Sequence, residues 1–202
     1  MEEISQILQL EDYFDLVEDA FRLYAEDKSL DTGLLHIDTQ DGEFHIKAGG
    51  LVKGKAYLGL KLNGGFFQNQ KRFGLPNIQG IIILCDGEDG SPLAIMESVG
   101  ITINRTGATT GVAAKYLAKP NSETVTICGC GTQGRVQLRS LKQVLPLKKA
   151  FAIDMDPDTS ARFAAEMADE LQMEVMAIDV VEEALAESDV LVTCTPSSSP
   201  FI

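Results

Sequence analysis

The sequence is short of basic residues. Its 202 residues include 17 lysines and arginines against 30 aspartates and glutamates, which gives a net charge of −13. A surface this acidic repels phosphate backbones and anionic lipid, so the charge argues against nucleic acid and membranes as partners. An anionic cofactor would need a local site that overcomes the field of the whole protein.

The sequence also lacks features that mark other classes of protein. No apolar run approaches the roughly 18 residues of a membrane-spanning helix. The chain opens with Met1-Glu2-Glu3, which is acidic where a secretion signal is basic. Four cysteines show neither a C-x-x-C pair nor disulfide-like spacing: Cys85, Cys128, Cys130 and Cys194. We interpret them as reduced thiols, expect a cytoplasmic location and assign no metal site.

The composition is otherwise that of a globular protein, 45% hydrophobic and 23% charged, with enough apolar material for a sizeable core. The pattern over residues 1–120 predicts an α+β domain that begins with an amphipathic helix over 4–29. Short β-like runs follow between turn signals such as Asp41-Gly42. They cover 33–37, 43–47, 57–63, 80–85 and 92–97, and a helix rich in small residues follows over 102–118.

The pattern changes at residues 121–202, after a polar break at 119–123. Strands expected at 124–128, 150–154, 174–177 and 190–193 alternate with helices expected up to residue 145 and over 159–171 and 181–186. Such alternation predicts α/β architecture with a Rossmann-type, doubly wound parallel sheet.

The strand at 124–128 leads into the chain's one match to G-x-G-x-x-G. In Gly129-Cys130-Gly131-Thr132-Gln133-Gly134, the first glycine permits a tight turn, the second lets backbone approach a pyrophosphate, and the third lets the helix pack on the sheet. The start of that helix offers free N–H groups and positive potential. This context favours a dinucleotide site, although such turns also occur without a ligand.

An acidic residue at the end of the next strand indicates which dinucleotide the site would bind. Asp154 lies 20 residues after Gly134, where a carboxylate can accept hydrogen bonds from the ribose hydroxyls. Because a carboxylate would repel a 2′-phosphate, NAD is favoured over NADP. Arg135 and Arg139 lie nearby and keep NADP open as the alternative.

At this point the chain resembles the ornithine cyclodeaminase/mu-crystallin family, which also contains some alanine dehydrogenases and ketimine reductases. The motifs that carry the resemblance extend over nearly the whole chain: "LGLKLN", "GLPNIQG", "DGEDGSPLAIME", "TINRTGATTGVAAKYLAKP", "CGCGTQG" and "VLVTCTPS". The resemblance implies that the first domain binds substrate and forms a homodimer, and that the second, residues 121–202, binds the nicotinamide cofactor.

Site residues follow from the matching motifs. Lys61 matches the family's active-site lysine, and Arg105 an arginine that contacts substrate or cofactor, so both are candidate catalytic and substrate-binding residues. A positively charged side chain can grip a carboxylate, and a lysine of lowered pKa can also exchange protons. The matches also imply cofactor contacts for Asn77, Arg105, Thr132, Gln133 and Thr195, beside Gly129, Gly131, Gly134 and Asp154. The alternatives without a function are that Lys61 is a surface lysine, that Arg105 forms a salt bridge on the helix surface, and that Thr195 is a hydroxyl at the end of a strand.

Two departures from the family pattern affect these expectations. Leu34 occupies the position at which the family often has a substrate-binding arginine, and Lys47 could supply the missing charge or be a solvated strand lysine. His36 and His45 flank the same hairpin and are expected to be structural or surface residues. In the family roughly another third of the protein follows, with the remaining strands of the sheet and the acid/base aspartate. The resemblance therefore implies that the Rossmann-type sheet is incomplete at its C-terminal side. We expect a fragment of a longer protein rather than a truncated product without turnover.

The resemblance implies an NAD-dependent enzyme that acts on a small amino acid or cyclic imine through an imine intermediate. The first expectation is an ornithine cyclodeaminase-like deaminating cyclisation to proline or a related amino acid. The alternatives are an alanine dehydrogenase or ketimine reductase, or a non-catalytic, crystallin-like nicotinamide-binding protein.

Overall fold

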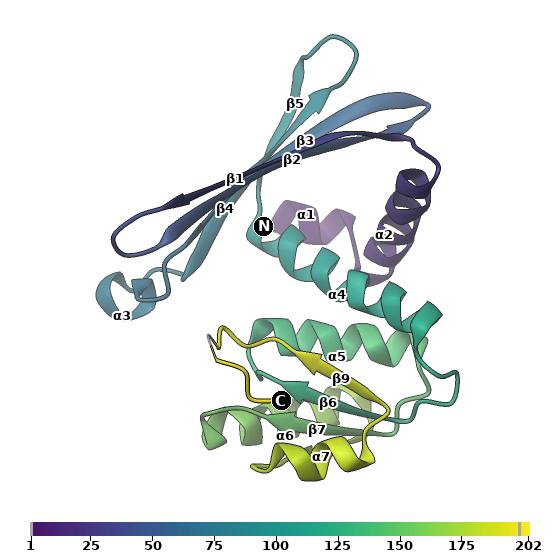
Figure 1. Cartoon of the computed structure of the whole chain (residues 1–202), viewed down its shortest axis with the longest axis vertical. Helices are drawn as coiled ribbons and strands as arrows, with labels where there is room; N and C mark the ends of the chain where they lie inside the picture. The colour runs from purple at the N-terminus through teal and green to yellow at the C-terminus, as the bar shows by residue number, and fades with distance from the viewer. Residues whose placement is uncertain (1, 198) are drawn as a thin grey trace. The chain divides into compact units, whose positions relative to one another are not determined.

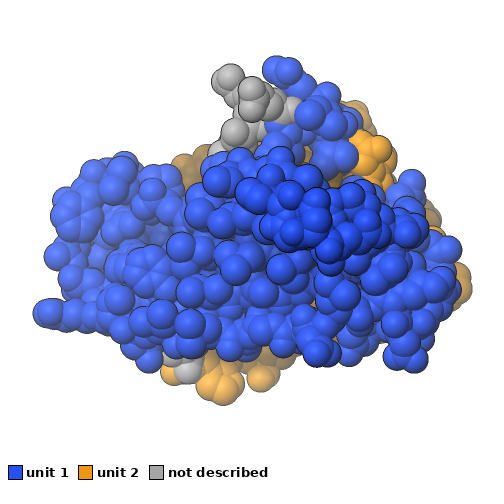
Figure 2. All heavy atoms as spheres, turned by 90° about the horizontal axis from the view of Figure 1, so that it is seen from above, with its two compact units in different colours: residues 1–9, 15–102 blue, residues 10–14, 103–202 orange. Residues whose placement is uncertain are grey.

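The computed structural model describes residues 2–197 and 199–202, drawn in Figure 1. The chain divides into two compact units, coloured in Figure 2: unit 1 comprises residues 1–9 and 15–102, and unit 2 comprises residues 10–14 and 103–202. The division falls inside helix α4 (Val99–Leu117), whereas the sequence pattern placed a boundary at 119–123, just after this helix. No helix of these described residues is long and apolar enough to cross a membrane.

Unit 1 is built on a five-stranded antiparallel sheet whose strands are neighbours in chain order. The strands are β1 (Ser29–Asp38), β2 (Glu43–Lys53), β3 (Lys55–Gly65), β4 (Ile78–Asp86) and β5 (Pro92–Glu97). The turn between β2 and β3 is tight because Gly54 adopts a φ of +74°, which glycine reaches without a steric penalty. All the β-like runs expected from the sequence are present as strands, and most of the strands are longer than predicted.

Two helices precede this sheet, where the sequence predicted one. Helix α1 (Glu2–Ile7) ends before Leu8, and helix α2 (Leu10–Ala25) begins with Glu11 and Asp12 in its first turn. These acids suit the positive end of a helix. The apolar spacing continues across the break, so periodicity alone could not reveal it. The sequence also missed the short helix α3 (Asn69–Phe73), which ends at Gly74 with a left-handed φ of +67°.

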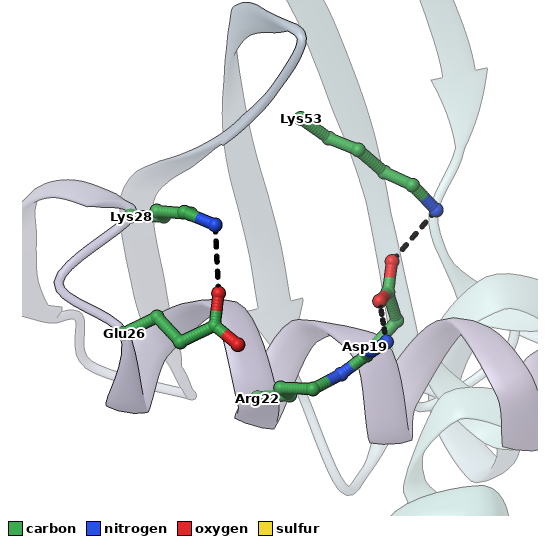
Figure 3. Close-up of polar contacts among 5 residues, drawn as sticks. All are labelled: Asp19, Arg22, Glu26, Lys28 and Lys53. Atoms are coloured by element: carbon green, nitrogen blue, oxygen red, sulfur yellow. Dashed lines mark hydrogen bonds and ion pairs between the residues drawn. The ribbon is translucent and has the colours of Figure 1, made fainter.

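Ionic contacts join α2 to the sheet of unit 1. Lys53, the last residue of β2, donates to Asp19 on α2 with an Nζ–Oδ2 distance of 2.7 Å (Figure 3). Asp19 also contacts Arg22 one turn further along the helix. The hydrogen bond from Lys53 is the main reason that the pKa of Asp19 lies below its ordinary value. Lys28 and Glu26 form a second pair, at 2.7 Å, where α2 leads into β1.

The sheet of unit 1 leaves apolar surface uncovered. Every apolar side chain in the buried core of the described residues belongs to unit 2, whereas Leu34 on β1 and Ile95 on β5 are each 71% exposed. Other large apolar side chains on these strands are exposed as well: Leu35, Ile37, Tyr57, Ile81 and Leu93. By register, Leu35, Ile37, Ile81 and Ile95 share one face of the sheet, opposite to the face of Leu34. Exposed apolar surface of this kind is typical of a face that another protein surface covers.

Unit 2 contains a four-stranded parallel sheet in the order β8-β7-β6-β9. Its strands are β6 (Thr124–Cys128), β7 (Lys149–Ile153), β8 (Glu174–Ala177) and β9 (Val190–Thr193). Numbered along the chain, this is the order 3-2-1-4, with which a Rossmann sheet begins. The predicted Rossmann-type fold is confirmed, with a half sheet as expected.

Three helices make the crossovers of this sheet: α5 (Thr132–Val144), α6 (Pro157–Leu171) and α7 (Val181–Glu187). Crossovers between parallel strands are right-handed, so α5 and α6 share one face and α7, where the strand order reverses, takes the other. Side chains from β6, β7, α5 and α6 form the core, including the fully buried Ile127, Leu141 and Phe163.

Helix starts were the least predictable boundaries. Helix α4 begins at Val99, three residues earlier than expected, because the Glu97 carboxylate accepts the N–H groups of Val99 and Gly100 at 2.5 and 3.2 Å. Helix α6 begins at Pro157, where a missing N–H costs nothing, after Asp156 accepts the N–H of Asp158 at 3.2 Å.

Helix α4 packs on α5 through a glycine. A Cβ built on Gly107 would lie 2.8 Å from Val136 Cγ2 and 2.7 Å from Ser140 Oγ, both on α5. These separations are shorter than real side chains tolerate, so the two helices approach as closely as they do only because residue 107 lacks a side chain.

We predict that Gly107→Val lowers the free energy of unfolding by about 2 kcal/mol, because the added methyl groups overpack the contact with α5. Thr109→Val is the matched control, since it places the same side chain two residues away with no change in volume. Urea denaturation of both variants measures the difference. Equal midpoints for the two variants would show that the α4–α5 contact is not tight.

Candidate functional site

The glycine turn between β6 and α5 uses its three glycines for three different reasons. Gly129 has a φ of +97°, and a Cβ there would meet the carbonyl carbon of Cys194 at 2.9 Å. A Cβ on Gly134 would lie 2.2 Å from the carbonyl oxygen of Gly129. A Cβ on Gly131 would meet no atom within 4 Å, so the backbone here is open to an approaching group.

The start of α5 is suited to an anion. Its N-cap residue is Gly131, which has no side chain to cap the helix, and its first turn contains no acid. The first N–H groups of a helix lack partners within the helix, and they carry the positive end of its dipole. The open space at Gly131 and these N–H groups together make a site that a pyrophosphate would fit.

Asp154 lies directly beside this turn. It follows the last residue of β7, it is half-buried, and its Oδ2 accepts the N–H of Cys130 at 2.8 Å. Its Oδ1 accepts the N–H of Asp156 at 3.1 Å. The carboxylate predicted to contact ribose is therefore held at the turn by two backbone hydrogen bonds, a structural role that spacing alone did not suggest.

The end of β9 completes the edge of this site in unit 2. Cys194 donates its N–H to the carbonyl of Cys128 at 2.7 Å, which extends the pairing of β9 with β6 by one residue. Thr195 is exposed, and its methyl group lies 3.1 Å from the position of a Cβ on Gly129. The strand order reverses between β6 and β9, and ligands of open α/β sheets bind at such a point.

The two arginines that left NADP as an alternative cofactor form ion pairs with helix α6. Arg135 pairs with Glu166 on α6 at 2.5 Å, and Arg139 forms a two-pronged contact with Glu170 at 2.5 and 2.7 Å. The bond to Glu170 also raises the pKa of Arg139. Both guanidinium groups are thus committed to holding α5 against α6 and are not arranged to receive a 2′-phosphate.

In unit 1, the register of the sheet brings together the positions expected to bind substrate. Lys61 on β3 is directly opposite Lys47 on β2, and Lys47 is directly opposite Leu34 on β1. Directly opposed residues share a face of the sheet. Two lysines side by side repel each other, so this pair is an arrangement that an anionic ligand would stabilise.

A pocket of about 220 Å³ lies over this pair. Lys47 and Lys61 line it together with Glu43, His45 and Asn63. Asn63 accepts a hydrogen bond from the Ser98 hydroxyl at 2.7 Å, which fixes its side chain. Glu43 and Asn63 were not among the predicted site residues, although the alternation of residues along β2 and β3 places both on the same face as the lysines. A larger cavity of about 670 Å³, lined by Phe44, Leu62 and other residues, contains none of the predicted site residues.

Asn77 and Arg105 belong to different units of the chain. Asn77, in unit 1, accepts the N–H of Gln70 on α3 at 3.1 Å, so its side-chain oxygen fastens this short helix. Arg105 is on α4 in unit 2 with the glycine turn, whereas Lys61 is in unit 1. Arg105 is an exposed residue as a whole, and desolvation of its guanidinium group lowers the pKa of that group. An arginine nevertheless stays cationic at neutral pH.

Thr132 and Gln133 occupy the first turn of α5, as predicted. Thr132 is exposed and available to a ligand at the helix start. The Oε1 of Gln133 lies 3.4 Å from the Nε2 of Gln137, one turn further along the helix.

The parallel half sheet and its glycine turn place the chain among Rossmann-type α/β proteins. The sequence pattern of the ornithine cyclodeaminase/mu-crystallin family matches residues 1–202, and the chain belongs to this family, as the resemblance predicted.

Three known proteins illustrate the similarity. An archaeal alanine dehydrogenase dimer with bound NAD has 34% identity and a TM-score of 0.92, covering 100% of this chain and 61% of its own. The Δ(1)-pyrroline-2-carboxylate reductase of Thermococcus litoralis, in complex with NADH and L-proline, has 31% identity and a TM-score of 0.86. The match covers 95% of this chain and 59% of that chain. L-lysine cyclodeaminase of Streptomyces rapamycinicus is 38% identical over 133 residues, 66% of this chain and 38% of that protein.

The chain spans about 60% of the length of the curated relatives that it matches from end to end.

The thiol of Cys130, inside the glycine turn, is predicted to be unreactive. The side chain is 1% exposed, and burial raises its pKa to about 12, so the reactive thiolate is scarce at pH 8. Iodoacetamide followed by peptide mass spectrometry should modify Cys130 at least about 1,000-fold more slowly in the native protein than in guanidinium. Similar rates in the two states would show that the turn opens readily.

Proposed function

We propose that this chain belongs to an NAD-dependent enzyme that acts on a small amino acid through an imine. The observation that carries the proposal is the carboxylate of Asp154, held at a glycine turn whose helix start is bare and open. In this proposal unit 2 binds the cofactor through Gly129, Gly131, Thr132, Gln133, Gly134, Asp154 and Thr195, and unit 1 binds the substrate.

Several features support NAD over NADP. The Asp154 carboxylate would accept hydrogen bonds from ribose hydroxyls and repel a phosphate at the same place. Arg135 and Arg139, the nearby cations, are paired with Glu166 and Glu170. The two similar solved structures contain NAD and NADH. When bound, NAD would supply a hydride acceptor for the α-carbon of the substrate.

The chain's own residues would bind and polarise the substrate. Lys61 and Lys47 would hold its carboxylate, because two ammonium groups on one face of the sheet attract an anion. Lys61 would in addition exchange a proton with the nitrogen of the imine. Arg105 would contact the substrate carboxylate or the cofactor, and Asn77 the cofactor. These last two roles rest on the family resemblance.

Two reactions of the imine intermediate are compatible with this site. The first, which the family description supports, is deaminating cyclisation: an amine in the substrate's side chain attacks the imine, ammonia leaves, and the returned hydride gives proline or a related amino acid. The second is an amino-acid dehydrogenase or imine reductase. The archaeal alanine dehydrogenase and the pyrroline-carboxylate reductase support it, as does the apolar Leu34 beside Lys47.

We further propose a homodimer formed through the sheet of unit 1. The exposed apolar side chains of β1 and β5 support it, and the similar archaeal alanine dehydrogenase is a dimer. The four free cysteines agree with the proposed cytoplasmic location.

Asp154→Ala should weaken NAD binding at least tenfold and leave NADP binding equal or stronger, because the variant loses a ribose acceptor and a repulsive charge. Asp154→Asn is the control for structure, since its amide oxygen can still accept the N–H of Cys130. Fluorescence titration with both reduced cofactors measures the ratio of their affinities. If both affinities fall equally, Asp154 acts on the turn and does not read the ribose.

Lys61→Met should reduce turnover at least 100-fold while NAD affinity changes less than twofold, because the lysine acts on substrate. Turnover is followed through NADH absorbance and ammonia release with ornithine, lysine, alanine and proline. The assay uses this chain and the product of its whole reading frame. Lys71→Met, an exposed lysine of α3, is the matched control. Normal turnover in Lys61→Met would refute the catalytic assignment.

A further inference from the structure

The chain's two histidines lie opposite each other on the β1–β2 hairpin. His36 is paired with His45, and Asp38, two residues along β1, is paired with Glu43 on β2. Residues directly opposite, and residues two apart along a strand, share a face of the sheet. The four side chains therefore form a block on one face of the hairpin, although the sequence separates them by an intervening turn.

The polar atoms of this block converge. His36 Nε2 is 3.2 Å from Glu43 Oε2, and His45 Nε2 is 3.1 Å from Glu43 Oε1. One ligand atom from each of these three residues can be chosen so that all lie within 4.8 Å of one another. Asp38 Oδ1 lies 3.0 Å from the same His36 Nε2.

These separations resemble those around a metal ion. Ligand atoms 2.0–2.1 Å from a tetrahedral zinc ion lie about 3.3 Å from one another. The observed distances of 3.1 and 3.2 Å from the two imidazoles to Glu43 are close to this value, and the three ligand atoms would draw together from separations of at most 4.8 Å to surround an ion. The side chains of His36, His45 and Glu43 are 44%, 36% and 35% exposed, which leaves a path for an ion to enter.

We propose that His36, His45 and Glu43 bind one divalent transition-metal ion, with Asp38 or water as the fourth ligand. Two imidazoles and a carboxylate suit zinc, cobalt or nickel, whereas magnesium and calcium prefer oxygen ligands alone. The protein's net charge of −13 attracts cations to its surface. This proposal is the alternative to the expectation that both histidines are structural or surface residues.

The site borders the proposed substrate pocket but does not depend on it. Glu43 and His45 line the pocket that also contains Lys47 and Lys61. A bound ion would hold the two strands of the hairpin together at the rim of this pocket. Because the three ligands all belong to unit 1, ion binding can be measured without NAD or substrate.

The test is calorimetric titration of purified protein, freed of any affinity tag, with zinc chloride and with cobalt chloride. We expect one ion per chain, at least tenfold weaker binding in His36→Gln or His45→Gln, and at least 100-fold weaker binding in the double variant. Asp41→Asn, which removes a carboxylate from the same hairpin outside the block, should bind as the unchanged protein does.

Two further measurements separate this site from the four thiols and from a folding defect. Cobalt bound here should show visible d–d bands without the thiolate charge-transfer band that cysteine ligands produce. Because the chain has only two histidines, zinc should shift the imidazole NMR signals of both in the unchanged protein. No binding at millimolar zinc, unshifted imidazole signals, or binding retained by the double variant would each overturn the proposal.

Discussion

The proposed cofactor turn of unit 2 depends on the close approach of α5 to the carbonyl of Gly129. With a side chain at residue 134, a Cβ would lie 2.2 Å from that oxygen, so the helix can begin where it does only with glycine there. Its start therefore points bare N–H groups at the turn, and the N–H of Cys130 is directed to Asp154 at 2.8 Å. The proposed anion site and the position of the Asp154 carboxylate, which we propose discriminates between the cofactors, both depend on the shape of this turn.

In the proposed function, the two units of this acidic chain bind anions in different ways. Unit 2 uses backbone: the dipole of a helix start needs no basic side chain and keeps the surface acidic. Unit 1 uses two lysines in one row of an antiparallel sheet, although like charges directly opposite each other cost stability. A backbone site suits a pyrophosphate of fixed shape, whereas side-chain cations suit a small carboxylate that must enter and leave.

The sequence predicted what depends on local spacing and missed what depends on register. Alternation of strands and helices, the three glycines and the 20-residue interval to Asp154 were sufficient to predict the half Rossmann sheet and its turn, and the expected strands were found. The sequence placed Lys47 in the region of Leu34 and both histidines on one hairpin. The direct alignment of Lys47 with Lys61, and of His36 with His45, required the pairing of strands, which no single segment specifies. The role of Asn77 in fastening α3 was equally hidden, because its partner Gln70 belongs to a helix too short to show periodicity.

Glu43 connects the proposed metal ion to the choice between substrates. A diamino acid such as ornithine or lysine brings a second ammonium group, which the two lysines of the pocket would repel and a carboxylate would accept. Glu43 is the one carboxylate among the described residues that line this pocket, and both histidines already point toward it. If Glu43 binds a metal ion, a diamine finds only cations there. Occupancy of the metal site would then favour substrates with small apolar side chains, in agreement with the exposed Leu34 beside Lys47, and would favour dehydrogenase or reductase chemistry over cyclisation.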